Sequence, residues 1–393
     1  MNGKKSYVFT IAITALITCL ITNVAKDFIS VTEEGKSMQK ISVVKKMLSE
    51  YSLFEVDETK VADYASMAMA AAVDDPYTAY FSKEDFSSYR DNLVSSYVGV
   101  GATIGADMQN DMLVIVSPME DSPAEKAGIK SGDILKAIDG KTYFANQLSE
   151  AATYLKNGEE GTTVTITLER EGKGEFEVAV TREEIIKRSV KSEMLEDGIG
   201  YLRITGFESK TDNNSQDTYD AFIEHISALK TAGMEKLVID LRDNPGGDLN
   251  VVCKIADEFL PKGIITYTED KNGKRSTIYS DDKAVDIPIV ILVNGGSASA
   301  SEVLTGALKD YEKATVIGTK TYGKGIVQTV YPFSDGSGMS ITTAKYYTPG
   351  GTCIHKIGIE PDITVELDTD KAISELEVNE DTQLLKAIEV LSK

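Results

Sequence analysis

The 393-residue chain has few of the side chains on which metal sites and several hydrolase mechanisms depend. It contains three cysteines. Cys19 lies in an apolar N-terminal stretch, so Cys253 and Cys353 remain, which are too few for a disulfide scaffold or a thiolate metal site. The spacing leaves one bridge between these two residues open, and two free buried thiols are the favoured alternative.

The shortage of histidine limits the choice of catalytic base. A Ser-His-Asp triad or a histidine-ligated metal would have to use His225 or His355, because the chain has two histidines. His225 lies in segment 218–230, whose apolar spacing predicts an amphipathic helix, where a lone histidine is usually a surface or core residue. We therefore expect any hydrolase here to use another base, with no metal or cofactor.

Basic residues are outnumbered, since 41 Lys and Arg stand against 62 Asp and Glu and give a net charge of −21. This excess repels phosphate backbones, and no long basic run offsets it, so nucleic acid is excluded as a partner. The length exceeds one domain of about 100–200 residues. The hydrophobic fraction of 42% is enough to bury several cores.

An uncharged run at residues 7–24 follows Lys4 and Lys5. Its length is near the minimum for crossing a bilayer and exceeds the usual core of a signal peptide. The preceding lysines place the N-terminus in the cytoplasm and the bulk of the chain outside. We expect a single-pass cell-membrane protein; the alternative, a cleaved signal peptide, would also export the rest of the chain.

The remaining patterns change along the chain. Helical spacing at 41–53 and 61–73 gives way to short β-rich runs at 113–116, 163–168 and 176–180, with one helix near 147–156. Strands and helices then alternate, which predicts an α/β core. The predicted regions are a cytoplasmic tip with membrane anchor, a helical region, a β-rich domain, the core and a C-terminal helix, at 1–30, 31–95, 96–182, 183–375 and 376–393.

Elements of the core follow from its apolar runs and breaks. Strands are expected at 200–204, 236–240, 288–293 and 315–317, and helices at 218–232, 249–259 and 300–311. Three of the segments that leave these strands carry unusual residues.

The first is a Pro245-Gly246-Gly247 turn that follows a buried strand and precedes a helix. Glycines let backbone N–H groups turn toward a ligand, and a helix N-terminus favours negative charge. Such a turn suits an oxyanion hole, which needs fixed donors where charge develops. A simple tight turn is the alternative.

The second segment is NGGSASASE at 294–302, again between an apolar strand and a helix. A nucleophile placed there is exposed, and the next backbone N–H can help to hold an oxyanion. Serine is also a favoured N-cap. The spacing leaves Ser297, Ser299 and Ser301 open as candidates.

The third segment places Lys324 between Gly323 and Gly325. In an extended chain Gln328 would point the same way as Lys324 and could orient its amine. To act as a base near neutral pH the lysine needs a pKa lowered by about 3 units, or roughly 4 kcal/mol of burial against charge. A surface lysine is the alternative.

Taken together, these segments resemble the C-terminal processing peptidases, also called tail-specific proteases. The resemblance covers nearly the whole chain after the apolar run. It rests on DDPY, a PDZ-type SPAEKAGIKSGD with a later IDG, DLRDNPGG, SASASE, GKGIVQ, TPG and GIEPD, at 74–77, 122–133, 138–140, 240–247, 297–302, 323–328, 348–350 and 358–362.

This resemblance implies an α/β fold, namely a β-β-α spiral like that of crotonase and Clp-protease proteins, into which a PDZ domain is inserted. It implies a serine endopeptidase with Ser299 as nucleophile, Lys324 as general base and Gln328 holding the lysine. The oxyanion hole would combine Ala300 N–H with Gly246 or Gly247. Asp310 would be structural.

A PDZ domain adds a peptide strand to its own sheet and binds the C-terminal carboxylate with backbone N–H groups. We therefore expect protein substrates with free apolar C-termini. The predicted groove consists of the loop residues Tyr97, Val98, Gly99, Val100, Gly101 and Ala102 and the helix residues Leu148, Ala152 and Leu155. Asn157 stands where family members often carry an arginine linked to gating, which leaves gating by this domain open.

The helical ends suggest self-association into a homodimer or higher oligomer. Two other classes of function remain as alternatives. One is a catalytically silent, membrane-tethered PDZ adaptor, and the other is a crotonase-like acyl-CoA enzyme.

Overall fold

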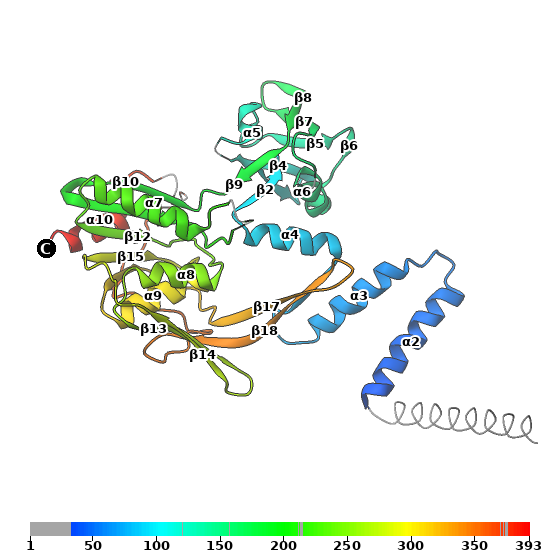
Figure 1. Ribbon diagram of the computed structural model, residues 1–393. Coiled ribbons are helices and arrows are strands. Elements are labelled where there is room, and N and C mark those ends of the chain that lie inside the picture. Colours follow the sequence, from blue (N-terminus) through cyan, green and yellow to red (C-terminus); the bar gives the residue numbers. More distant parts are fainter. Residues whose placement is uncertain are drawn as a thin grey trace, which may run out of the picture. The chain divides into compact units, whose positions relative to one another are not determined.

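The computed structural model describes residues 33–119, 121–156, 158–210, 212, 215–369, 371, 373 and 376–393 (Figure 1). The chain divides into two compact units, Met1–Asp74 and Asp75–Lys393. The anchor predicted at 7–24 and Asn157 lie outside the described residues. Within the described ranges, no helix has both the length and the apolar character needed to cross a bilayer.

The first unit contains the helices α2 (Glu33–Tyr51) and α3 (Glu58–Ala71). Asp57 starts α3, because its side chain accepts hydrogen bonds from the backbone N–H groups of Thr59 and Lys60. Helices were predicted in this region. Many large apolar side chains of the unit are exposed: Met38, Ile41, Val43, Val44, Met47, Leu48, Tyr51, Leu53, Phe54, Tyr64, Met69 and Val73.

The core of the second unit is a mixed sheet with the strand order β10-β11-β12-β15-β16-β19. β10 is antiparallel to β11, and every later neighbour in this order is parallel. The strands are Val190–Met194, Ile199–Ile204, Lys236–Asp240, Ile289–Val293, Ala314–Gly318 and Ile363–Thr364. β15 is buried along its whole length, as expected for a parallel strand that is covered on both faces.

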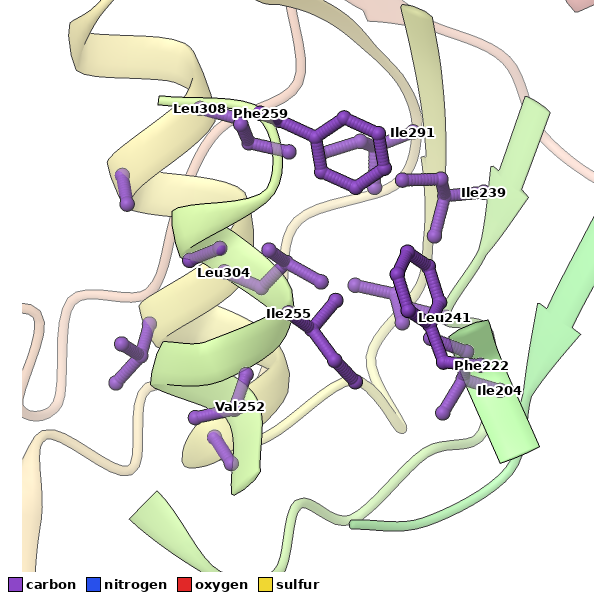
Figure 2. Close-up of a cluster of buried hydrophobic side chains, with 14 of the residues drawn as sticks. Ile204, Phe222, Ile239, Leu241, Val252, Ile255, Phe259, Ile291, Leu304 and Leu308 are labelled. Carbon is purple, nitrogen blue, oxygen red and sulfur yellow. The ribbon is translucent and has the colours of Figure 1, made fainter. Parts of the chain in front are cut away.

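Helices cover both faces of this sheet. Ile239 and Ile291 pack with α7 (Thr218–Thr231), α8 (Leu249–Asp257) and α9 (Ala300–Asp310), in the cluster that Figure 2 shows. The adjacent residues Val238 and Val290 point to the opposite face and pack with α10 (Thr382–Leu391). This alternation follows from the two-residue period of a strand.

The C-terminal helix is joined to the sheet by a buried ion-pair network. Arg242 is fully buried and donates to Asp240 Oδ2 over 2.6 Å and to Asp381 Oδ2 over 2.7 Å. Asp381 also starts α10 by accepting from Leu384 N. The predicted C-terminal helix thus docks on its own chain at the residues that follow β12.

A second sheet was not anticipated from the sequence. Its strands are β1 (Ala79–Phe81), β13 (Gly263–Asp270), β14 (Arg275–Ser280), β17 (Ile326–Pro332) and β18 (Gly338–Tyr347). β18 pairs with β1, β13 and β17. β17 begins two residues after Lys324, and β18 pairs with β1 near the start of the second unit. The β17–β18 hairpin therefore links the lysine segment to β1.

A β-rich domain has its own apolar core, as predicted. Its sheet contains β3, β4, β5, β6, β7 and β8, at Ala102–Asp107, Met112–Pro118, Ile134–Ile138, Lys141–Thr142, Thr163–Arg170 and Gly174–Thr181. The predicted helix is α6 (Leu148–Lys156), and a short α5 spans Pro123–Lys126. In the chain, α4 (Lys83–Leu93) precedes this β-rich domain. The strands β2 (Ser96–Gly99) and β9 (Glu183–Ile186), which flank the domain in the sequence, pair with each other.

The cysteine alternatives are settled in the structure. Cys253 and Cys353 are both free, so they form no bridge. Cys253 is buried, whereas Cys353 is half-buried.

Candidate active site

The segments that follow β12, β15 and β16 meet at one edge of the sheet. These strands are parallel neighbours, so their carboxyl ends lie at the same edge. A cleft of about 550 Å³ opens there. It is lined by all the residues predicted for the catalytic pair and the oxyanion hole, namely Gly246, Gly247, Ser299, Ala300, Lys324 and Gln328.

Contacts distinguish the three candidate serines. Ser297 Oγ donates to Leu241 O over 2.8 Å, and Ser301 Oγ donates to Asn244 O over 3.0 Å. Both serines are fully buried, and these bonds join the loop to the 241–244 segment that precedes the glycine turn. Ser299 is half-buried and lines the cleft. Its position at the start of α9 makes it the serine that a substrate can reach.

The backbone of Ser299 is held in an unusual conformation. Its φ is 56° and its ψ is −113°, a region that residues with a Cβ seldom occupy. Such strain persists only where surrounding contacts enforce it, and it is concentrated at functional sites. The segment between β15 and α9 therefore places its strained residue at Ser299.

Glu302 supplies those contacts, and it was given no role in the predictions made from the sequence. Its Oε2 accepts from Ser299 N and Lys324 N, each over 2.9 Å. Its Oε1 accepts from Thr321 Oγ1 over 2.6 Å and from Gly323 N over 2.8 Å. The carboxylate is fully buried and joins the serine loop to the lysine loop. The Ser-x-x-Glu spacing of a capping box was the signal available for it.

Tyr346 on β18 makes a second connection between these loops. Its hydroxyl donates to Ser299 O over 2.7 Å and also contacts Lys324 O. Burial raises the pKa of Tyr346 well above its ordinary value, so the hydroxyl stays protonated as a donor. No sequence pattern points to this residue, because its contacts join segments that lie 22 and 47 residues away in the chain.

The glycine turn lies directly against the serine. A Cβ added to Gly246 would lie 2.8 Å from Ser299 Cβ and 2.9 Å from Ala300 N, and Gly246 has a φ of +106°. Gly246 N donates to Asn244 Oδ1 over 2.8 Å, so this N–H is already engaged. Gly247 N–H and Ala300 N–H are then the candidate oxyanion donors, and Gly246 N–H, also predicted as a donor, is left out of this set.

Lys324 is half-buried in the cleft. Burial lowers its pKa, and the nearby charge of Asp75 opposes this by raising it. The ammonium nitrogen lies 4.6 Å from the centre of the Tyr77 ring. Among the described residues, no hydrogen bond joins Lys324 Nζ to Ser299 or to Gln328.

Gln328 instead donates from Nε2 to Thr342 Oγ1 over 3.2 Å. The expectation that Lys324 and Gln328 point the same way assumed one continuous strand. However, β17 starts at Ile326, and its register shifts between Val327 and Gln328. Gln328 lines the cleft, and its role in holding the lysine stays a prediction.

Neither histidine lines this cleft. His225 lies on α7 and its Nδ1 is 2.7 Å from Ser192 Oγ. His355 has a pKa lowered by burial and by nearby Lys356 and Lys345. The candidate base that does line the cleft is Lys324. A base other than histidine therefore stays the prediction.

The predicted PDZ groove residues lie in β2, β3, their connection and α6. Tyr97 is half-buried and Lys156 Nζ lies 4.9 Å from the centre of its ring. Val100 and Leu155, predicted in the groove, are instead buried in the core of this domain. The helical face chosen from the sequence therefore includes one residue that points inward. Ala102 and Leu148 are partly buried against the same core.

Comparisons with known proteins agree with this arrangement. Residues 198–365 match the model of peptidase family S41, and residues 102–180 match the model of the PDZ domain. A "Probable CtpA-like serine protease" of Staphylococcus aureus (strain COL) is 36% identical over 96% of this chain and 77% of its own length. A "Carboxy-terminal-processing protease" of Bartonella bacilliformis is 39% identical over 79% of this chain and 70% of its own.

Solved structures show the same likeness. A "Photosystem II D1 C-terminal processing protease" aligns with a TM-score of 0.51 and 29% identity, over 86% of this chain and 88% of that one. A "Putative S41 protease" from Bacteroides fragilis aligns with a TM-score of 0.55 and 19% identity, over 88% and 96%, and supports the fold. The chain therefore belongs to peptidase family S41, as a serine-type, PDZ-containing relative of the carboxy-terminal-processing proteases.

Proposed function

We propose that the protein is a serine endopeptidase that cleaves extracytoplasmic proteins after recognising their C-terminal tails, with Ser299 and Lys324 as its catalytic pair. One observation carries the proposal. The buried carboxylate of Glu302 holds the backbone of both residues while both line one cleft.

The proposed reaction starts with acyl transfer to the serine. Neutral Lys324 takes the proton of Ser299 Oγ, and Oγ bonds to the carbonyl carbon of the peptide. The oxyanion that forms accepts hydrogen bonds from Gly247 N–H and Ala300 N–H. When it collapses, the C–N bond breaks and the Lys324 ammonium donates its proton to the leaving amine.

Water completes the cycle. Lys324 takes a proton from the water, whose oxygen attacks the acyl carbon. The C–Oγ bond then breaks, and Ser299 regains its proton from the lysine. Lys324 must leave its position beside Tyr77 for these steps, and catalytic hydrogen bonds commonly tighten only when substrate is bound.

For substrate selection, we propose that the PDZ domain binds free, apolar C-terminal tails. Gly99 lies next to the end of α6, since a Cβ there would be 3.4 Å from Leu155 O. The loop and helix predicted for the groove are thus adjacent, so a tail added as a strand beside this loop would also lie near α6. Substrates that differ only in a free or amidated C-terminus test this, and equal cleavage of both would contradict it.

Membrane attachment and location are proposed from the N-terminal sequence. The 7–24 run after Lys4 and Lys5 supports a single anchor with the peptidase outside the cytoplasm. Carbonate extraction of membranes that contain the full chain should leave it in the pellet. A chain that lacks residues 1–30 and pellets equally would contradict the anchor.

We also propose a homodimer or higher oligomer, since the first unit exposes a large set of apolar side chains. The core is proposed to be the β-β-α spiral, supported by the strand-strand-helix order of β10, β11 and α7. The proposed domain limits are 96–182 and 183–375. Sedimentation of the chain with and without residues 31–71 tests the oligomer.

The experiment for the catalytic proposal is peptide cleavage followed by mass spectrometry. Ser299→Ala and Lys324→Ala should each abolish cleavage, whereas Ser297→Ala, at a buried neighbour, should keep the same cleavage products. Cleavage by Ser299→Ala or Lys324→Ala at the wild-type rate would contradict the catalytic pair. The silent-adaptor alternative predicts no cleavage by the wild type.

A further inference from the structure

The segment Asp75–Thr78, just before β1, packs against the candidate base. The Tyr77 ring lies under the Lys324 ammonium, with 4.6 Å between the nitrogen and the ring centre. This distance is within the range of a cation–π interaction. Tyr77 is half-buried, and its hydroxyl lies 3.5 Å from that of Tyr322. The ring is therefore positioned as a surface for the lysine.

Asp75 fixes this segment in place. Its Oδ1 accepts from Tyr77 N over 3.1 Å and its Oδ2 accepts from Thr78 Oγ1 over 2.6 Å. Thr78 Oγ1 in turn accepts from Thr342 N over 3.2 Å on β18. Thr342 Oγ1 is also the acceptor for Gln328. The Tyr77 ring is thus tied to the hairpin that carries Gln328.

Asp75 is charged at neutral pH. Burial would raise its pKa, but hydrogen bonds from Thr342 and Thr78 outweigh burial, and the pKa lies below its ordinary value. Its negative charge favours the ammonium form of Lys324, as does the face of the Tyr77 ring. Burial of the lysine acts in the opposite direction. The protonation of Lys324 is a balance between these effects.

Other groups surround Lys324 from the elements packed against it. Glu302 of α9 binds Lys324 N, and the Tyr346 hydroxyl of β18 contacts Lys324 O. His355 packs on the adjacent Gly325, where a Cβ would lie 2.4 Å from His355 N. Tyr322 lies beside Tyr77. Of these groups, Tyr322 loses its hydroxyl contact in the Tyr77 variants, and His355 loses the nearby charge of Asp75 in Asp75→Asn, whereas the contacts of Glu302 and Tyr346 with the Lys324 backbone involve neither residue.

We propose that Asp75 and Tyr77 are positioning residues that hold Lys324 as an ammonium ion above the Tyr77 ring and set the pH above which this base becomes active. The proposal rests on the proposed function, in which Lys324 acts as the base. Substrate must then draw the lysine off the ring toward Ser299. Removing either residue makes the neutral amine available at lower pH.

The test measures kcat/KM against pH for the full chain on one peptide substrate. Tyr77→Leu removes the ring, and Asp75→Asn removes the charge while keeping its size. Each should move the rising limb of the profile to lower pH, by roughly half to one pH unit. Tyr77→Phe keeps the ring and should keep the wild-type position of the limb. Asp335→Asn, an exposed site in the β17–β18 turn, is the charge-matched control and should not move it.

Rising limbs of Tyr77→Leu and Asp75→Asn that coincide with the wild type, or that move to higher pH, would overturn the proposal. A limb that moves equally in Asp335→Asn would also overturn it. If Tyr77→Leu shows no cooperative thermal unfolding, the test rests on the rising limb of the kcat/KM profile of Asp75→Asn. Cleavage by Lys324→Ala at the wild-type rate would instead overturn the proposed function, so the two failures are distinguishable.

Discussion

Glu302→Gln tests whether one carboxylate holds the catalytic loops together. Oε2 of Glu302 accepts from Ser299 N and Lys324 N, and Oε1 accepts from Thr321 Oγ1 and Gly323 N. A glutamine has one oxygen and one NH₂ group, so either orientation turns a donor toward two existing donors. If the NH₂ replaces Oε2, two buried backbone N–H groups lose their acceptor. In the other orientation Gly323 N–H loses its acceptor, since the Thr321 hydroxyl can rotate.

The loss of stability follows from the number of buried N–H groups that Glu302→Gln leaves without an acceptor. At about 1–3 kcal/mol for each buried unsatisfied group, one or two donors reduce the free energy of unfolding by about 1–6 kcal/mol. The displacement of the Ser299 and Lys324 backbones should reduce kcat/KM by about 100-fold or more, since small misplacements are costly to catalysis.

Urea unfolding and peptide cleavage measure the two effects on the same preparations. Glu269→Gln is the matched control, because this carboxylate forms a surface ion pair with Arg275. It should change unfolding by less than about 1 kcal/mol. A Glu302→Gln protein that matches this control in both unfolding and kcat/KM would refute the reasoning.

Other substitutions and conditions give further expected outcomes. Gly246→Ala should cut kcat/KM severely while circular dichroism stays native, since its Cβ would lie 2.8 Å from Ser299 Cβ at a φ of +106°; wild-type activity would contradict the close approach. Asp381→Ala removes one of the two carboxylates that pair with buried Arg242, together with the N-cap of α10, and should cost about 2–5 kcal/mol in urea unfolding, whereas a change below 1 kcal/mol would argue against the network. The profile of kcat/KM should rise with pH as the Lys324 ammonium loses its proton, with a midpoint below the ordinary 10.5 because burial lowers this pKa; a profile that falls through this range would contradict a lysine base. Iodoacetamide should modify Cys353 before Cys253, because burial raises the pKa of the Cys253 thiol to about 12; preferential labelling of Cys253 would contradict its burial.

Much of the core could be predicted from the sequence because its strands are uniformly apolar. β12 and β15 carry runs such as Val290 to Val293 that are typical of a strand buried on both faces. The helices of the core, such as α7 and α9, carry apolar residues at helical spacing over several turns. Their predicted bounds are therefore close to the observed ones. The β13–β14 and β17–β18 hairpins were missed, because their strands are half-exposed and their pattern is weak.

The residues of the cleft were predictable where glycines and serines sit at strand ends, as at Gly247 and Ser299. The choice among the serines was not predictable from the residues alone. It depends on where Ser297 and Ser301 donate, and their acceptors lie more than fifty residues away. Tyr346 was missed for the same reason, and Tyr77 was predicted only as part of the DDPY motif, without a role, since each contacts the lysine segment from another part of the chain.

The central claim is that Ser299 is a nucleophile activated by Lys324. The most direct measurement is the intact mass and modified residue of the protein after reaction with a fluorophosphonate. We expect one adduct on Ser299 in the wild type, none in Ser299→Ala, and labelling of Lys324→Ala slowed by at least about 100-fold. An adduct on another serine, or equally fast labelling without Lys324, would contradict the account.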